Sequence, residues 1–125
     1  MTVCALAAGG DYRQRQAAIA ARLDPLVMSA VIFEGIDPDH ASGHAADAFP
    51  AASTNLRIVT IAIGCPCCDG GMVMRVSLNR MLQQRPARLF ISLADPTHLT
   101  HLQQYLSAPP YADFVTLAPV LDLDD

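Results

Sequence analysis

The residues best suited to chemistry in this chain are three cysteines within four positions, Cys65, Cys67 and Cys68. A β-branched apolar run, residues 56–63, leads into them, and a segment with helical periodicity follows. Thiols this close together on a strand-to-helix turn can bind a soft metal ion jointly or form a local disulfide. A helix N-terminus next to the turn favours both reactions, because its partial positive charge lowers the pKa of a thiol.

The first interpretation is a metal site formed by these three cysteines. Zinc and copper(I) favour thiolate ligands, and zinc usually takes four ligands in a tetrahedron. Three thiolates leave one position for water, a histidine or a partner's cysteine, and such an open position suits metal transfer better than structural zinc. We therefore predict that Cys65, Cys67 and Cys68 bind Zn²⁺. His40 and His44, four residues apart amid aspartates, are candidate auxiliary ligands, although solvated loop histidines are commoner.

Two other interpretations stay open on the residues alone. The order Cys65-Pro66-Cys67-Cys68 is a C-P-x-C sequence, which is typical of thioredoxin- and glutaredoxin-like oxidoreductases when it begins a helix after a strand. In that case Cys65 is the attacking thiol and Cys68 resolves the mixed disulfide. The third interpretation is an interaction module in which the cysteine turn is vestigial.

Strands and helices alternate along the chain that carries this turn. Apolar runs predict strands over residues 2–8, 26–33, 56–63, 89–93 and 114–121. Helical spacing predicts helices over residues 12–23, over residues 72–85, and from Pro96 to the Pro109-Pro110 pair. Crossovers of this length favour parallel pairing, so we expect an α/β fold, a single open, mostly parallel sheet of about five strands with helices on both faces. Ligands of such sheets lie beyond the C-terminal ends of strands, where the cysteine turn falls.

Length and composition limit the classes of function. The 125 residues suit one domain, residues 1–125, and no apolar run approaches the roughly 20 residues that a membrane span needs. The net charge of −4 argues against a nucleic-acid partner, because phosphate binding depends on basic residues. Cysteines packed together rather than spaced as a disulfide framework, and an N-terminus without a basic start, indicate a soluble cytoplasmic protein.

Four segments resemble one known family in the same order along the chain. The sequence Gly64-Cys65-Pro66-Cys67-Cys68 resembles the G-C-x-C-C motif of the CobW-type P-loop GTPases and metal chaperones. Residues 31–37 are similar to a shortened form of that family's N-E-F-G segment, residues 88–96 to its R-L-V-I-E-x-x-G-L-A-D-P segment, and residues 114–122 to the strand that ends in V-D-A. The resemblance implies a P-loop-NTPase-like half domain and a metal-binding cysteine turn.

The departures from the family's pattern concern its nucleotide chemistry. If Gly10 takes the place of the last P-loop glycine, Asp11 stands where a lysine should hold the phosphates, and Tyr12 where a Ser/Thr should hold magnesium. A carboxylate ~4 Å from a phosphate charge is repelled by roughly 4 kcal/mol at an effective dielectric of 20. The switch E-x-x-G and an N-K-x-D motif are also missing from this sequence, which holds no lysine among its eight basic residues. We therefore expect no bound nucleotide and no GTPase activity.

The combined prediction is a degenerate, non-catalytic relative of that family that binds, hands on or senses zinc. The resemblance to metal chaperones implies a metal-recipient protein as a partner. A GTPase domain that stops after its fifth strand should leave apolar surface or a sheet edge uncovered, so we also expect a homodimer.

Overall fold

Helices and strands alternate through the computed structural model, which describes residues 2–24, 26–35, 56–61, 72–94 and 96–122. The strands are β1 (Thr2–Ala8), β2 (Ser29–Glu34), β3 (Leu56–Ile61), β4 (Arg88–Ser92), β5 (Val115–Leu117) and β6 (Leu121–Asp122). The α-helices are α1 (Tyr12–Ala20), α2 (Met72–Gln83) and α3 (Leu99–Leu106), and two 3-10 turns are η3 (Pro96–His98) and η4 (Tyr111–Asp113).

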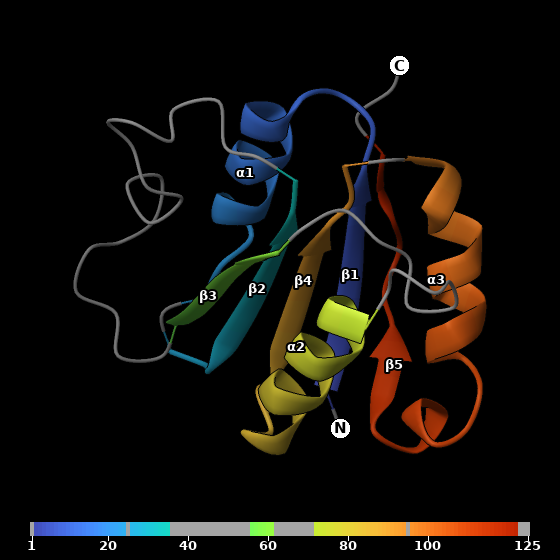
Figure 1. Cartoon of the computed structure of the whole chain (residues 1–125). Coiled ribbons are helices and arrows are strands. Elements are labelled where there is room, and N and C mark those ends of the chain that lie inside the picture. Colours follow the sequence, from blue (N-terminus) through green and yellow to red (C-terminus); the bar gives the residue numbers. More distant parts are fainter. Residues whose placement is uncertain (1, 25, 36–55, 62–71, 95, 123–125) are drawn as a thin grey trace.

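The strands form one parallel sheet in the order β3-β2-β4-β1-β5, and β6 pairs with the last residues of β1 (Figure 1). Every residue of β2 is buried, and β1 and β4 are buried over most of their length. Strands covered on both faces need such continuous apolar runs, because neither face can be left to water. The predicted α/β class, with a parallel sheet and helices on both faces, is confirmed.

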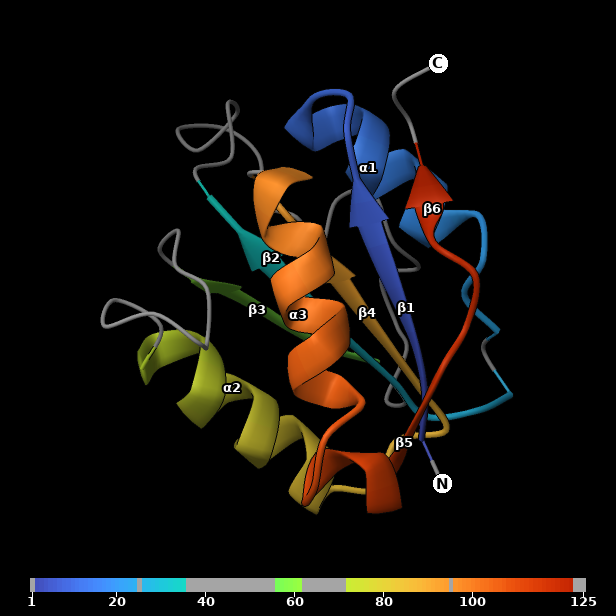
Figure 2. The same cartoon turned by 90° about the vertical axis from the view of Figure 1, so that its right-hand side faces the viewer.

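The two faces of the sheet carry different helices (Figures 1 and 2). On one face, α2 and α3 pack against alternate strand residues, with Leu78 and Leu102 fully buried. On the other face α1 covers the sheet through Ile19 and through Tyr12, whose ring stacks on Phe33 at a centroid distance of 5.3 Å. None of the helices within the described ranges is long and apolar enough to cross a membrane.

Two predicted elements differ from the structure. The strand predicted over residues 114–121 is split into β5 and β6, because Pro119 has no N–H for the ladder, although Ala118 N still donates to Cys4 O at 2.8 Å. The helix predicted from Pro96 begins instead with the 3-10 turn η3, and α3 starts only at Leu99. Asp95, the residue before this turn, lies outside the described residues.

A hydrogen-bonded tyrosine pair links α2 and α3, the two helices that cover the same face of the sheet. Tyr111 Oη donates to Asn79 Oδ1 of α2 at 2.6 Å and accepts from Tyr105 Oη of α3 at 3.2 Å. Burial, followed by the hydrogen bond from Tyr105, raises the pKa of Tyr111 from 10.0 to about 12. Because the pKa of Tyr111 is higher in the folded protein than in the unfolded chain, the protonated hydroxyl stabilises the fold. This stabilisation is complete below pH 10 and is lost as the pH rises toward 12.

We predict that Tyr111→Phe lowers the free energy of unfolding by about 1 kcal/mol, because the partly buried hydrogen bond to the Asn79 amide oxygen is lost. Tyr105→Phe is the matched control and should cost less, since it removes only the longer bond. Urea denaturation followed by circular dichroism measures both values. Equal values for the two variants would show that the bond to Asn79 does not hold α2 to this corner.

Candidate metal-handling site

The C-terminal ends of the parallel strands meet at one edge of the sheet, and the turns predicted to carry the site start from this edge. The last residue of β3, Ile61, is the register partner of Glu34 at the end of β2, and Gly35 N donates to Ile61 O at 3.0 Å. The chain next re-enters the described residues at the start of α2. The predicted ligands of the cysteine turn and the auxiliary histidines lie outside the described residues: Cys65, Cys67, Cys68, His40 and His44.

Glu34 is a buried carboxylate at this edge, and its side chain is 0% exposed. Its Oε1 accepts a hydrogen bond from Ala94 N at 3.1 Å, which ties the end of β2 to the end of β4. Gly35 follows with φ +109°, and a Cβ there would lie 3.1 Å from the Cβ of Ala94. Glu34 was not among the predicted site residues. A charged residue directly after the apolar run of residues 26–33 was the signal for its structural role.

The topological switch point of the sheet lies between β1 and β4. From β1 the chain passes through α1 to β2, toward one edge of the sheet. From β4 it passes through α3 to β5, toward the other edge, and α3 covers the face opposite to α1. In open α/β sheets this is where ligands bind. Here the space holds Arg15, which is 5% exposed. Its Nε donates to Ser92 Oγ at 2.8 Å, and its Nη1 donates to the carbonyl oxygens of Gly9 and Gly10 at 3.2 and 3.1 Å.

The N-terminus of α1 is closed by its own side chains. The Asp11 carboxylate accepts from Gln14 N at 2.8 Å, and the Gln14 amide oxygen accepts from Asp11 N at 2.8 Å, a complete capping box. In a P-loop the N-terminus of the helix after the glycine turn receives phosphate oxygens. Tyr12, the first residue of α1, is 6% exposed and packs against Phe33. This first turn is therefore built around internal contacts.

The described ranges hold no group of three or more His, Cys, Asp or Glu side chains that could bind a metal. Cys4 is fully buried in the core, and burial raises the pKa of its thiol to about 12. The prediction that Cys4 packs as a small hydrophobic residue is confirmed. His98 is half-buried at the start of α3, and His101 is exposed on that helix.

The chain is similar to the zinc chaperone YeiR of Escherichia coli strain K12, with 41% identity over 78 residues. The matched part is 59% of this chain and 23% of YeiR, so the chain spans less than a quarter of that relative's length. No family model and no solved structure matches the chain. A zinc chaperone as a relative agrees with the resemblance to metal chaperones over part of the chain.

The closed first turn predicts that GTP, GDP and ATP with magnesium do not bind. The reason is that Asp11 occupies the helix N-terminus with negative charge and Arg15 is already bonded to both glycine carbonyls. Isothermal titration calorimetry measures this, and Asp11→Asn is the matched variant, because asparagine keeps the cap and removes the charge. Both proteins should give no binding heat. A dissociation constant in the low micromolar range, about −8 kcal/mol, would contradict the prediction.

Proposed function

We propose that this protein binds zinc and hands it on, or senses it, through Cys65, Cys67 and Cys68, with His40 and His44 as auxiliary ligands. The observation that carries the proposal is the grouping of three thiols between β3 and α2 in a chain that is partly similar to a zinc chaperone. The metal is the cargo of this site, because three thiolates leave a fourth position through which zinc can enter and leave.

The elements on either side of the turn support this role. The helix α2 begins four residues after Cys68 and runs for 12 residues, so its N-terminal partial charge favours thiolates in the turn before it. Met74, Leu78 and Met81 are buried against the sheet and fix this helix in place. On the other side, β3 is paired with β2 along its whole length. The turn is therefore anchored at both ends to rigid elements.

The proposed activity includes no nucleotide hydrolysis, and the contacts of Asp11 and Arg15 support this part of the proposal. A metal-recipient protein as a partner, a cytoplasmic location and a homodimer also remain proposals. The homodimer is supported by exposed apolar side chains near the N-terminal ends of β1 and β5, where Val3 is 44% and Phe114 is 55% exposed. The alternative function, a thiol–disulfide oxidoreductase that uses Cys65 and Cys68, rests on the same turn.

Single cysteine variants test the zinc site. Cys65→Ser, Cys67→Ser and Cys68→Ser should each weaken zinc binding by a similar large factor, because each replaces a thiolate ligand with a poor one. Affinity should also fall as the pH drops, since zinc uptake releases the thiol protons. Competition with a chromophoric chelator under reducing conditions measures both effects. Cys4→Ser is the control and should bind zinc normally, because Cys4 is buried away from the turn.

The same variants separate zinc binding from redox chemistry. An oxidoreductase would lose disulfide-reductase turnover with Cys65→Ser and Cys68→Ser but would tolerate Cys67→Ser, because only the outer pair exchanges disulfide. If Cys67→Ser keeps both full reductase activity and the zinc behaviour of the unmodified protein, the three-thiolate site is wrong and the redox function replaces it.

A further inference from the structure

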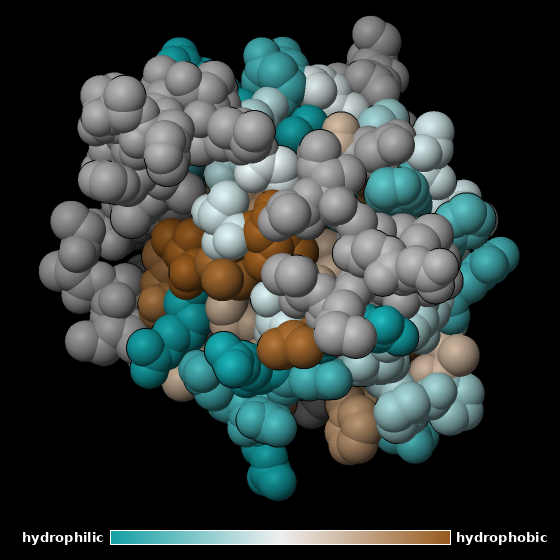
Figure 3. Space-filling model, in the orientation of Figure 1, coloured by the Kyte–Doolittle hydropathy of each residue, from teal (hydrophilic) through white to brown (hydrophobic). Residues whose placement is uncertain are grey.

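Side chains of β3 and α2 form a mixed apolar and basic surface, which we call the β3–α2 surface and define by Arg57, Val59, Val76 and Arg80. Arg57 and Val59 lie two residues apart on β3 and so share the face of the sheet that α2 covers. Val76 is 44% exposed on α2, and Arg80 follows it by one helical turn. Figure 3 shows hydrophobic side chains gathered over β3 with hydrophilic residues directly below them.

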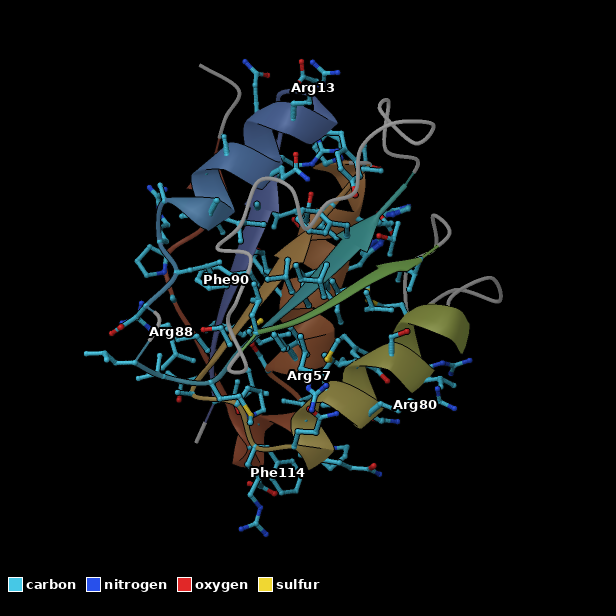
Figure 4. The ribbon with its side chains drawn as sticks, turned by 90° about the vertical axis from the view of Figure 1, so that its left-hand side faces the viewer. Arg13, Arg57, Arg80, Arg88, Phe90 and Phe114 are labelled. Carbon is cyan, nitrogen blue, oxygen red and sulfur yellow. The ribbon has the colours of Figure 1, made fainter. Side chains whose placement is uncertain are left out.

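The two arginines give this surface a positive charge. Both Arg57 and Arg80 are exposed, and Figure 4 shows them near α2 on the side of β3, far from Arg13 at the other end of the molecule. No ion pair joins either of them to a carboxylate of the described residues. Asp24, in the loop before β2, accepts the Leu26 N–H at 2.9 Å. Glu34 is fully buried at the opposite end of its strand.

The strand beneath this surface is the end strand of the described sheet. β3 pairs with β2 alone, so within the described part of the chain its other side offers backbone N–H and C=O groups with no strand beside them. Sheet edges of this kind accept an added strand from another protein, with backbone hydrogen bonds giving affinity and alternate side chains giving specificity. Apolar residues beside arginine are also the side chains that protein interfaces favour.

We propose that the β3–α2 surface docks an extended acidic segment of a partner protein as an added strand along β3. Carboxylates at alternate positions of that segment pair with Arg57 and Arg80, and the pairing is strengthened because the arginine fork fits a carboxylate bidentately. Aliphatic side chains between them pack on Val59 and Val76.

Arg57 lies near the start of β3 and Arg80 in the last turn of α2, so a strand added along β3 runs from these arginines toward Ile61, after which the chain enters the segment with the three cysteines. The docked protein is the recipient of the metal in this account, because its added strand extends toward that segment. That step rests on the proposed zinc function. The docking itself depends only on the shape and charge of the described residues.

The test is fluorescence anisotropy with a labelled synthetic peptide of alternating glutamate and valine, with a lysine–valine peptide as the charge control. The acidic peptide should bind and the basic one should not, and binding should weaken as salt is added. The double variant Arg57→Glu/Arg80→Glu should weaken binding roughly tenfold or more. Arg13→Glu/Arg22→Glu makes the same charge change at α1 on the other face and should leave affinity unchanged.

Three further results decide the proposal. A glutamate–valine peptide that is N-methylated at alternate residues should bind much more weakly, and unchanged binding would overturn the added strand. Equal affinity of the double variant and the unmodified protein would overturn the site. A change in oligomeric state of the double variant by light scattering would assign the surface to a second copy and overturn the acidic partner. The variant with all three turn cysteines changed to serine should still bind the peptide. An unmodified protein that binds the peptide but not zinc would therefore contradict only the proposed function.

Discussion

Every strand of the described sheet runs in the same direction, and this one constraint arranges the rest of the molecule. Parallel strands need long crossovers, and those crossovers place α1 on one face and α2 and α3 on the other. The strands are therefore buried on both faces, and their polar residues lie mainly at the strand ends. The carboxyl ends meet at a single edge, so Ser92 of β4, which accepts from the buried Arg15 of α1, Glu34 of β2 and the end of β3 lie on neighbouring strands.

Arg15 fills the turn after β1 with contacts from the chain itself. A P-loop binds phosphate with backbone N–H groups and a lysine, and its charge balance is completed by the ligand. In this chain an arginine of the helix itself reaches back to the carbonyl groups of Gly9 and Gly10 and to Ser92. The turn is thereby stabilised without a ligand. The zinc binding proposed for this chain is assigned instead to the segment after β3, which carries the three cysteines.

The sequence predicted the parts of the fold that depend on long apolar periodicity. The first strand was predicted over residues 2–8 and is observed as Thr2–Ala8, because seven apolar or small residues end at a glycine pair. The split of β5 and β6 at Pro119 was missed because the apolar run continues through the proline. The roles of Arg15 and Glu34 were missed for another reason. Their partners, Ser92 and Ala94, lie 77 and 60 residues away, and only the topology brings them together.

The cysteine site could be proposed from the sequence because its three thiols lie in one short stretch, and zinc binding by these thiols is the central claim. X-ray absorption spectroscopy at the zinc edge, on protein loaded with one equivalent of zinc under reducing conditions, tests it most directly. We predict three sulfur ligands at about 2.3 Å and one lighter ligand at about 2.0 Å. A zinc ion coordinated by nitrogen and oxygen alone would contradict the claim.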